Sequence, residues 1–400
     1  MAFSATAVPL GLLFLISGFL VNILQVLTLP LLLFSKKAYR VTNFMLADMV
    51  WSELIWLLEW WADVKVKVYT DPETLRLMGK EHALLICNHR SDIDWLVGWL
   101  LAKRAGCLGG TRAIMKQSVK YLPVIGWSMW FSEYVFLARN WAKDETTLKA
   151  GYRNLKGFPR SFWLALFVEG TRFTQTKLAA AQEYAASVGM PIPRNVLIPR
   201  TKGFVSAIEN LRDFVPAVYD MSIAISNEAP EPNMSRILKG LPSVVHIKVK
   251  RVPMAELPTT DEGIANWCKE AFVRKDKELD EHNKTNTFGD ELYQPVERLW
   301  GPLWIVVGWA ILLLTGSIYL LRNVLSTWRG FLWVAGGLLL AAVVLEVLIA
   351  ASQAERSKPL KILFMEEEVL GPTVDILKED SFNSLANPVH GGGSPWSKWW

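Results

Sequence analysis

The stretch "ALLICNHRSDIDW", residues 83–95, joins an apolar run to a histidine and then to an acidic turn. Residues 83–87 are apolar throughout, which is typical of a central strand that is buried on both faces. Helical spacing follows from residue 94 to 104. The stretch therefore predicts a strand that leads directly into a helix, with His89 at the carboxyl end of the strand. In open α/β sheets, ligands bind at that edge.

Strand and helix patterns alternate along residues 63–298. Strands are predicted at 64–69, 83–88, 162–168, 195–199, 216–225 and 243–252, and helices at 94–104, 145–157, 175–188, 203–211 and 261–281. This alternation predicts an α/β domain in which helices cover a sheet. Residues 228–236 are predicted to form a loop or an insertion.

Two apolar runs near the C-terminus predict a transmembrane hairpin. Residues 301–321 contain no charged side chain, and residues 331–351 contain one, Glu346. Each run has about the ~20 residues that are needed to cross the hydrocarbon core of a bilayer. Tryptophans lie near the ends of both runs, as they do in the aromatic belts of membrane proteins.

The N-terminal apolar run, residues 8–34, is predicted to be a retained membrane anchor. No basic residue precedes it and no clear cleavage site follows, so a signal peptide is the weaker alternative. Lys36, Lys37 and Arg40 come next and favour a cytoplasmic position for residue 40. Residues 43–61 mix apolar, acidic and tryptophan side chains, which predicts a segment lying in the membrane interface.

The predicted organisation has four parts. They are an N-terminal membrane anchor with an interfacial helix at 1–62, a catalytic domain at 63–298, the hairpin at 299–352, and a poorly ordered tail at 353–400. The formal net charge of +5 suits anionic lipid surfaces and phosphorylated substrates. No basic stripe with interleaved aromatic residues is present, so nucleic-acid binding is not expected. The three cysteines lack disulfide or metal spacing, which favours a reduced compartment.

His89 and Asp94 are the candidate general-base pair. A carboxylate in the following helical turn can fix the tautomer of the imidazole and stabilise its charged form. Ser91 and Asp92 are explained equally well as the start of a helix, with Ser91 as its N-cap. A metal site using His82, His89, Asp92 and Asp94 is the competing interpretation. His82 precedes the strand and should lie at its far end, so no metal is expected.

The segment "FVEGTRF", residues 167–173, ends another apolar strand with polar side chains. Arg172 offers a planar fork for phosphate, and Glu169 can accept a hydrogen bond from a polyol. Gly170, next to Thr171, allows the backbone to approach a ligand closely. The alternative is a surface ion pair at the end of a strand.

Further basic residues follow other apolar runs. Arg200 and Lys202 in "LIPRTKGF", residues 197–204, precede a predicted helix whose N-terminus can bind an anion. Lys116 and Arg139 bracket an aromatic-rich segment. A solvated basic turn and simple packing are the respective alternatives.

Motifs of covalent and nucleotide-dependent catalysis are absent from the sequence. It contains no GxSxG elbow, no P-loop and no GxGxxG. Cys87 fits the pattern of the buried strand rather than that of a nucleophile. The pattern favours direct attack by a hydroxyl of the substrate over a covalent intermediate.

Taken together, four ordered motifs resemble those of the glycerolipid acyltransferase superfamily. They are His-x4-Asp at 89–94, Phe-Leu-Ala-Arg at 136–139, Glu-Gly-Thr-Arg at 169–172 and Ile-Pro-Arg at 198–200. The forms "LIPRTKGF" and "GWSMWFSEY" and the C-terminal hairpin are similar to the plant microsomal 1-acylglycerol-3-phosphate acyltransferases. The resemblance covers about residues 8–355.

The resemblance implies an αβ acyltransferase domain embedded in the membrane by N-terminal helices. It implies transfer of a fatty acyl group from acyl-CoA to the sn-2 hydroxyl of lysophosphatidic acid, giving phosphatidic acid and CoA. His89 would be the base and Asp94 its orienting partner, with acyl-CoA as co-substrate and no cofactor. The implied substrate-binding residues are Lys116, Arg139, Glu169, Gly170, Thr171, Arg172, Arg200 and Lys202.

The implied location is the endoplasmic reticulum membrane, with several spans and the catalytic domain facing the cytosol. The oxyanion of the thioester needs hydrogen-bond donors, and backbone N–H groups near Gly170 or Asn88 are candidates. Two alternatives remain open. One is an acyltransferase for a different lysophospholipid, and the other is a non-catalytic membrane lipid-binding protein.

Overall fold

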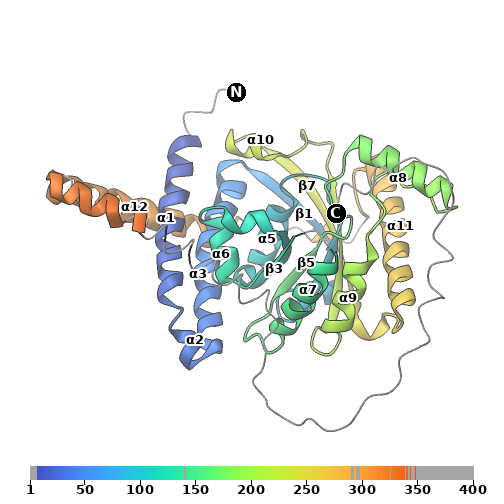
Figure 1. The fold of residues 1–400 in the computed structure, drawn as a ribbon. Coiled ribbons are helices and arrows are strands. Elements are labelled where there is room, and N and C mark those ends of the chain that lie inside the picture. Colours follow the sequence, from blue (N-terminus) through green and yellow to red (C-terminus); the bar gives the residue numbers. More distant parts are fainter. Residues whose placement is uncertain are drawn as a thin grey trace, which may run out of the picture.

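A computed structural model describes residues 7–138, 141–289, 292–293, 298–324, 326–337, 339–340, 343 and 347. It shows a mixed eight-stranded sheet with helices on both faces, which confirms the predicted α/β class (Figure 1). The predicted tail at 353–400, ten of the 21 residues of the predicted second hairpin helix at 331–351, and Arg139 lie outside the described residues.

Five parallel strands form one side of the sheet. The strand order is β4 (Val135–Leu137), β3 (Thr111–Lys116), β5 (Trp163–Leu166), β2 (Ala83–Cys87), β6 (Ala217–Ile225), β7 (Ser243–Pro253), β1 (Val64–Tyr69) and β8 (Leu292–Tyr293). β7 pairs antiparallel with β6, and β1 runs parallel to β7. The carboxyl ends of β2, β3, β4, β5 and β6 therefore share one edge, which we call the carboxyl edge; the opposite one is the amino edge.

The two faces of the sheet pack against different helices. α3 (Lys36–Trp56) and α5 (Asp94–Arg104) cover one face, and α7 (Trp141–Leu155), α9 (Thr201–Leu211) and α11 (Asp261–Thr285) cover the other (Figure 1). The side chains of β2 illustrate this division, since successive side chains of a strand point to opposite faces of the sheet. Leu85 packs in the cluster that contains Trp51, while Leu84 and Ile86 pack in the cluster that contains Phe204.

The other helices flank this core. They are α1 (Ala7–Leu27), α2 (Leu31–Phe34), a π-helical turn at Leu57–Trp61, α4 (Pro72–Leu77), α6 (Ile125–Phe131), α8 (Gln175–Ser187), α10 (Met234–Leu238) and α12 (Trp300–Asn323), with short 3₁₀ turns at Leu108–Gly110, Gln117–Tyr121 and Met254–Glu256.

Three helical segments are long and apolar enough to cross a membrane: Pro9–Phe34, Lys36–Trp61 and Trp300–Asn323. The first and last expose apolar side chains, as Leu33 and Leu314 illustrate at 84% and 64% exposure. The middle segment begins earlier than the predicted interfacial segment 43–61, because Ser35 caps it by accepting a hydrogen bond from the Ala38 N–H. Its placement in the interface stays a prediction.

The segment predicted as a strand at 195–199 is irregular, so that prediction was wrong. Its backbone N–H groups donate to the side chains of Asp276 and Glu169 instead of a neighbouring strand. Within the predicted loop 228–236 the short helix α10 begins, and α9 starts at Thr201, two residues before the prediction. Three short strands, β3, β4 and β8, were not predicted.

Candidate active site

His89 and Asp94 lie side by side at the carboxyl edge. The Nδ1 atom of His89 is 2.9 Å from Oδ2 of Asp94, whose side chain is 1% exposed, whereas the His89 side chain is 23% exposed. Because Nδ1 faces a carboxylate, it carries the proton, and Nε2 is left with a free lone pair. The predicted pair therefore has the geometry of a general base and its orienting carboxylate.

Local structure holds this pair in place. Asp94 lies in the first turn of α5, and its Oδ2 also accepts a hydrogen bond of 2.9 Å from the Ser91 N–H. Burial raises the pKa of Asp94, while the hydrogen bonds from His89 and Ser91 oppose that shift. On the other side, the His89 ring packs against Phe167, with 4.5 Å between ring centroids.

The predicted N-cap role of Ser91 was wrong, because Ile93 occupies that position. The Ser91 hydroxyl instead donates to the Pro232 carbonyl at 2.8 Å, and a carboxylate oxygen of Asp92 faces the Met234 N–H at 3.5 Å. The connection between β6 and β7 is thereby fastened to the turn that follows His89. The sequence carries no signal for these contacts, since the partners are about 140 residues apart.

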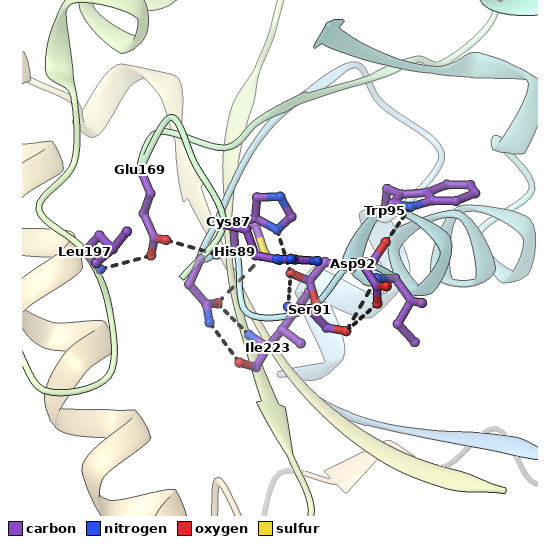
Figure 2. Close-up of polar contacts among 12 residues, drawn as sticks. Cys87, His89, Ser91, Asp92, Trp95, Glu169, Leu197 and Ile223 are labelled. Atoms are coloured by element: carbon purple, nitrogen blue, oxygen red, sulfur yellow. Dashed lines mark hydrogen bonds and ion pairs between the residues drawn. The ribbon is translucent and has the colours of Figure 1, made fainter. Parts of the chain in front are cut away.

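Asn88 fixes the end of β2 to β6. Its side chain donates to the Ile223 carbonyl at 2.9 Å and accepts from the Ile223 N–H at 2.8 Å (Figure 2). Cys87 is buried beside it, and burial raises the pKa of its thiol well above the ordinary value. A thiol of this kind is a poor nucleophile, in agreement with the interpretation of Cys87 as a packing residue.

Glu169 is buried at 2% exposure, and backbone N–H groups occupy its carboxylate. One oxygen faces the His89 N–H and the other faces the Leu197 N–H, each at 3.4 Å (Figure 2). Burial raises the pKa of Glu169 to about 8. These contacts tie the end of β2 to the irregular segment before α9, a connecting role that the sequence did not suggest.

Gly170 occupies a position that only glycine fits well. Its φ is +70°, and a Cβ atom there would lie 2.9 Å from Cδ of Arg200. The Arg200 N–H donates to the Val168 carbonyl at 2.7 Å, which holds the basic segment against β5. The Gly170 N–H donates to the Phe167 carbonyl at 2.9 Å. Because it already has this acceptor, it is not a candidate donor to an oxyanion.

Two more cations lie around this turn. Lys177 of α8 donates to the Thr171 hydroxyl at 2.6 Å and to the Arg172 carbonyl at 2.9 Å. The Arg172 side chain is exposed. The guanidinium of Arg90 lies over the ring of Phe173, 4.9 Å from its centroid, and the Phe173 N–H donates to the His89 carbonyl. Neither Arg90 nor Lys177 was predicted.

The remaining predicted residues are distributed along the same edge. Lys116 is the last residue of β3 and is exposed, and Lys202 is exposed in the first turn of α9. Arg139 lies outside the described residues, two positions after the end of β4. The topology thus collects the ends of β2, β3 and β5 at one edge, and Arg200 is held against β5 there.

A buried lysine lies below this edge. Lys275 of α11 is 1% exposed and contacts Oδ1 of Asp220 at 2.5 Å, the Met221 carbonyl at 2.6 Å and the Ser222 hydroxyl at 3.1 Å. Its charge lowers the pKa of Glu169 against the effect of burial. In the sequence, Lys275 lies among other charged residues of an exposed-looking helix, so nothing marks it out.

Within the described residues, no group of three or more histidine, cysteine, aspartate or glutamate side chains could hold a metal ion. His82 precedes β2 at the amino edge, where its Nδ1 accepts from the Phe162 N–H at 3.4 Å. It therefore lies at the far end of the strand from His89, as predicted, and does not join Asp92 and Asp94.

Two family models match the chain. Residues 65–226 match the family model described as Acyltransferase, and residues 236–309 match the one described as Acyltransferase C-terminus. The chain is thus an acyltransferase by family.

Three relatives make this assignment more specific. The chain is 55% identical to 1-acyl-sn-glycerol-3-phosphate acyltransferase 2 of Brassica napus over 90% of this chain and 93% of the relative. It is 56% identical to the protein of that name from Arabidopsis thaliana, with the same coverage. It is 38% identical to the human gamma protein over 76% of this chain and 81% of the relative. The chain belongs to the 1-acyl-sn-glycerol-3-phosphate acyltransferase family.

One solved structure also aligns with the chain. The crystal structure of the 1-acyl-sn-glycerophosphate acyltransferase PlsC from Thermotoga maritima gives a TM-score of 0.40 at 18% identity, covering 68% of this chain and 95% of that chain. This overlap is too low to add to the family assignment.

Proposed function

We propose that the protein transfers a fatty acyl group from acyl-CoA to the sn-2 hydroxyl of 1-acylglycerol 3-phosphate, giving phosphatidic acid and CoA. The observation that carries the proposal is the contact between His89 and Asp94 at 2.9 Å, with the buried carboxylate fixing the tautomer of the half-buried histidine. The names of the relatives supply the acceptor lipid.

In the proposed reaction, Nε2 of His89 takes the proton of the sn-2 hydroxyl while its oxygen attacks the thioester carbonyl carbon. The bond between carbon and sulfur then breaks, and the leaving thiolate takes the proton back from His89. Asp94 stabilises the imidazolium between these two steps. The pKa of a free hydroxyl is far above neutral, so a positioned base contributes about 10²–10⁴-fold to the rate. The proposal needs neither a metal nor an acyl-enzyme.

The cations of the carboxyl edge supply the proposed site for the glycerol phosphate. Arg172, Lys116 and Lys202 are exposed, and Arg200 is held against β5. Arg139 follows β4 toward the same edge. Glu169 and Gly170 support this site through the backbone, and Thr171 is fixed by Lys177. An arginine fork recognises phosphate by paired hydrogen bonds.

The proposed setting is the endoplasmic reticulum membrane, with the carboxyl edge on the cytosolic side. Both substrates carry acyl chains, so a site next to the membrane segments reaches them without carrying a chain through water. The proposed organisation keeps a membrane anchor at 1–62, a catalytic domain at 63–298, a hairpin at 299–352 and a tail at 353–400.

The test is an assay of microsomes that contain the chain, with labelled acyl-CoA and a panel of lysolipids, beside His89→Ala. We expect phosphatidic acid from lysophosphatidic acid, and loss of product in a folded His89→Ala variant. Equal product without His89 would contradict the mechanism. Acylation of another lysophospholipid in place of lysophosphatidic acid would keep the reaction class and overturn the acceptor.

A further inference from the structure

A cavity of about 690 Å³ opens at the amino edge of the sheet, far from His89. It is bounded by the residues that precede β2 and β5 and by the turn between α9 and β6. The residues that line it are 80–82, 158–161, 212–216 and 254–255. It is open to solvent, and no residue of the candidate active site belongs to it.

Basic side chains dominate the charge of this cavity. Lys80 and Arg160 line it and are exposed. In the described parts of the chain, neither forms an ion pair. Arg212 also lines the cavity, but its guanidinium donates to the carbonyls of Met254 and Leu257 at 3.1 and 3.3 Å, so it contributes charge rather than free donors.

The acidic residues of the lining leave this positive charge mostly uncompensated. Glu81 is occupied, since its carboxylate accepts from the Arg251 guanidinium at 2.7 and 3.1 Å and from the Tyr219 hydroxyl at 2.7 Å. Asp213 is exposed and is the remaining acid of the lining. Three lining cations therefore face one carboxylate that is not already paired.

More positive charge lies behind one wall. The ring of Phe158, which lines the cavity, has the guanidinium groups of Arg112 and Arg40 over it at 4.3 and 4.9 Å from its centroid. Arg40 is paired with Glu133 at 2.8 Å. Arg112 is 3% exposed, and burial lowers its pKa to about 10, so it remains a cation at neutral pH. A buried cation acts over a longer range than an exposed one, because little water screens it.

The cavity opens beside a candidate membrane span. The guanidinium of Arg160 lies 5.0 Å from the ring centroid of Phe44 in α3. This helix belongs to the candidate span Lys36–Trp61. A ligand bound by Arg160 would therefore lie next to this candidate span.

We propose that this cavity is a second anion site, which binds a phosphate monoester through Lys80 and Arg160. The chemistry is shared by an anionic lipid headgroup such as that of phosphatidic acid and by a soluble organophosphate. The position of Arg160 on Phe44 favours the lipid. His82 adds an N–H donor, since its Nδ1 accepts a hydrogen bond and the ring proton is therefore on Nε2.

The experiment compares two variants of the full chain in phosphatidylcholine nanodiscs, with native mass spectrometry counting bound dioctanoyl phosphatidic acid. Lys80→Gln with Arg160→Gln removes both proposed ligands. Arg274→Gln with Lys284→Gln removes one exposed arginine and one exposed lysine from α11 and is the matched control. The number of bound lipid molecules does not depend on catalysis, so it reports on this site as well as on the candidate active site. Thermal unfolding checks that each variant is folded.

We expect the control to bind two phosphatidic acid molecules per chain, as the wild type does, and the Lys80/Arg160 variant to bind the second at least about tenfold more weakly, or about 1.4 kcal/mol. Equal occupancy in both variants would overturn the proposal. If the double variant does not fold, each single substitution should weaken the binding of the second phosphatidic acid molecule. Glycerol 3-phosphate then separates the sources: displacement of that lipid assigns the site to a soluble organophosphate, and its retention to a headgroup.

Discussion

At the scale of single residues, the catalytic proposal depends on the charge of Asp94. We expect Asp94→Asn to lower kcat by about 10²–10⁴-fold, because an amide can still hold the His89 ring but cannot stabilise the imidazolium. The KM values should change little, since Asp94 is buried below the ring. Initial rates with labelled acyl-CoA would measure this, with the exposed Asp213→Asn as control. A kcat within threefold of the wild type would contradict the assignment.

Glu169 makes a prediction about pH. Its folded pKa of about 8 lies above the ordinary 4.5, so between these values the folded chain holds a proton that the unfolded chain has released. The contribution of Glu169 to stability is therefore present below about pH 4.5 and lost as the pH rises toward 8. We expect the Tm of Glu169→Gln to fall less than that of the wild type between about pH 6 and 9. Parallel Tm curves would show that Glu169 does not titrate in this range.

The contacts of Lys275 predict a large loss of stability in Lys275→Met. The substitution leaves Asp220, the Met221 carbonyl and the Ser222 hydroxyl without their buried donor. Removing one partner of a buried pair costs about 3–5 kcal/mol. Denaturant unfolding would measure the loss. Adding Asp220→Asn should recover part of it, since the orphaned charge is then gone; additive losses would instead indicate that the two side chains act independently.

At the scale of elements, the helices and strands that were predicted best are those in which the spacing of apolar residues is regular. β1 and α5 have the predicted bounds, since the alternating VKVKVY and the helical spacing after Asp94 are strong local signals. β3 and β4 were missed, because six and three residues inside an apolar, aromatic stretch show no clear period. The His89–Asp94 pair was predicted from its place at the end of an apolar strand, with Asp94 in the following helical turn, and from the family resemblance. The contacts of Glu169 and Ser91 were not, because their partners are distant in sequence.

The irregular segment 195–199 shows how an apolar run can mislead. Its composition resembles that of a strand, but the N–H groups of Arg194, Asn195 and Val196 donate to the carboxylate of Asp276 in α11 at 3.0, 2.6 and 3.2 Å. One side chain thus replaces a neighbouring strand. The segment also leads directly to Arg200, so its order bears on the candidate site.

We therefore predict that Asp276→Ala loosens this segment. Hydrogen exchange at residues 194–196 should accelerate at least about tenfold, because the carboxylate that accepts from their N–H groups is removed. The KM for the lysolipid should rise several-fold through Arg200, with a smaller change in kcat. Asp280→Ala is the control, since Asp280 forms ion pairs with the side chains of Arg194 and Lys284 among the described residues. Unchanged exchange at 194–196 would show that the segment is held by other contacts.

At the scale of the whole molecule, the candidate membrane spans pack against the domain that contains the sheet. Trp51 of α3 is fully buried, and its ring lies 4.3 Å from that of Trp99 in α5. α12 packs against α3 and against the π-helical turn Leu57–Trp61 that follows it. There Trp60 donates to the Leu299 carbonyl at 3.1 Å, and its ring centroid lies 5.1 Å from that of Trp300. Figure 1 shows α12 leaving the sheet domain beside α1. A boundary at residue 62 therefore divides the sequence but not the hydrophobic core.

α3 and α12 differ in how much of their length packs against the core, and this difference predicts the effect of truncating the chain. α3 is part of the core, whereas α12 touches it through its first turns and exposes most of its apolar length, as at Leu314 and Leu321. We expect a chain that ends at residue 298 to fold and to remain in the membrane pellet after carbonate extraction, because α1 still presents its apolar face to lipid. The full chain is the positive control, and a soluble marker checks the extraction. Release of the truncated chain into the supernatant would show that α12 is the principal anchor and that the α1 segment only lies on the surface.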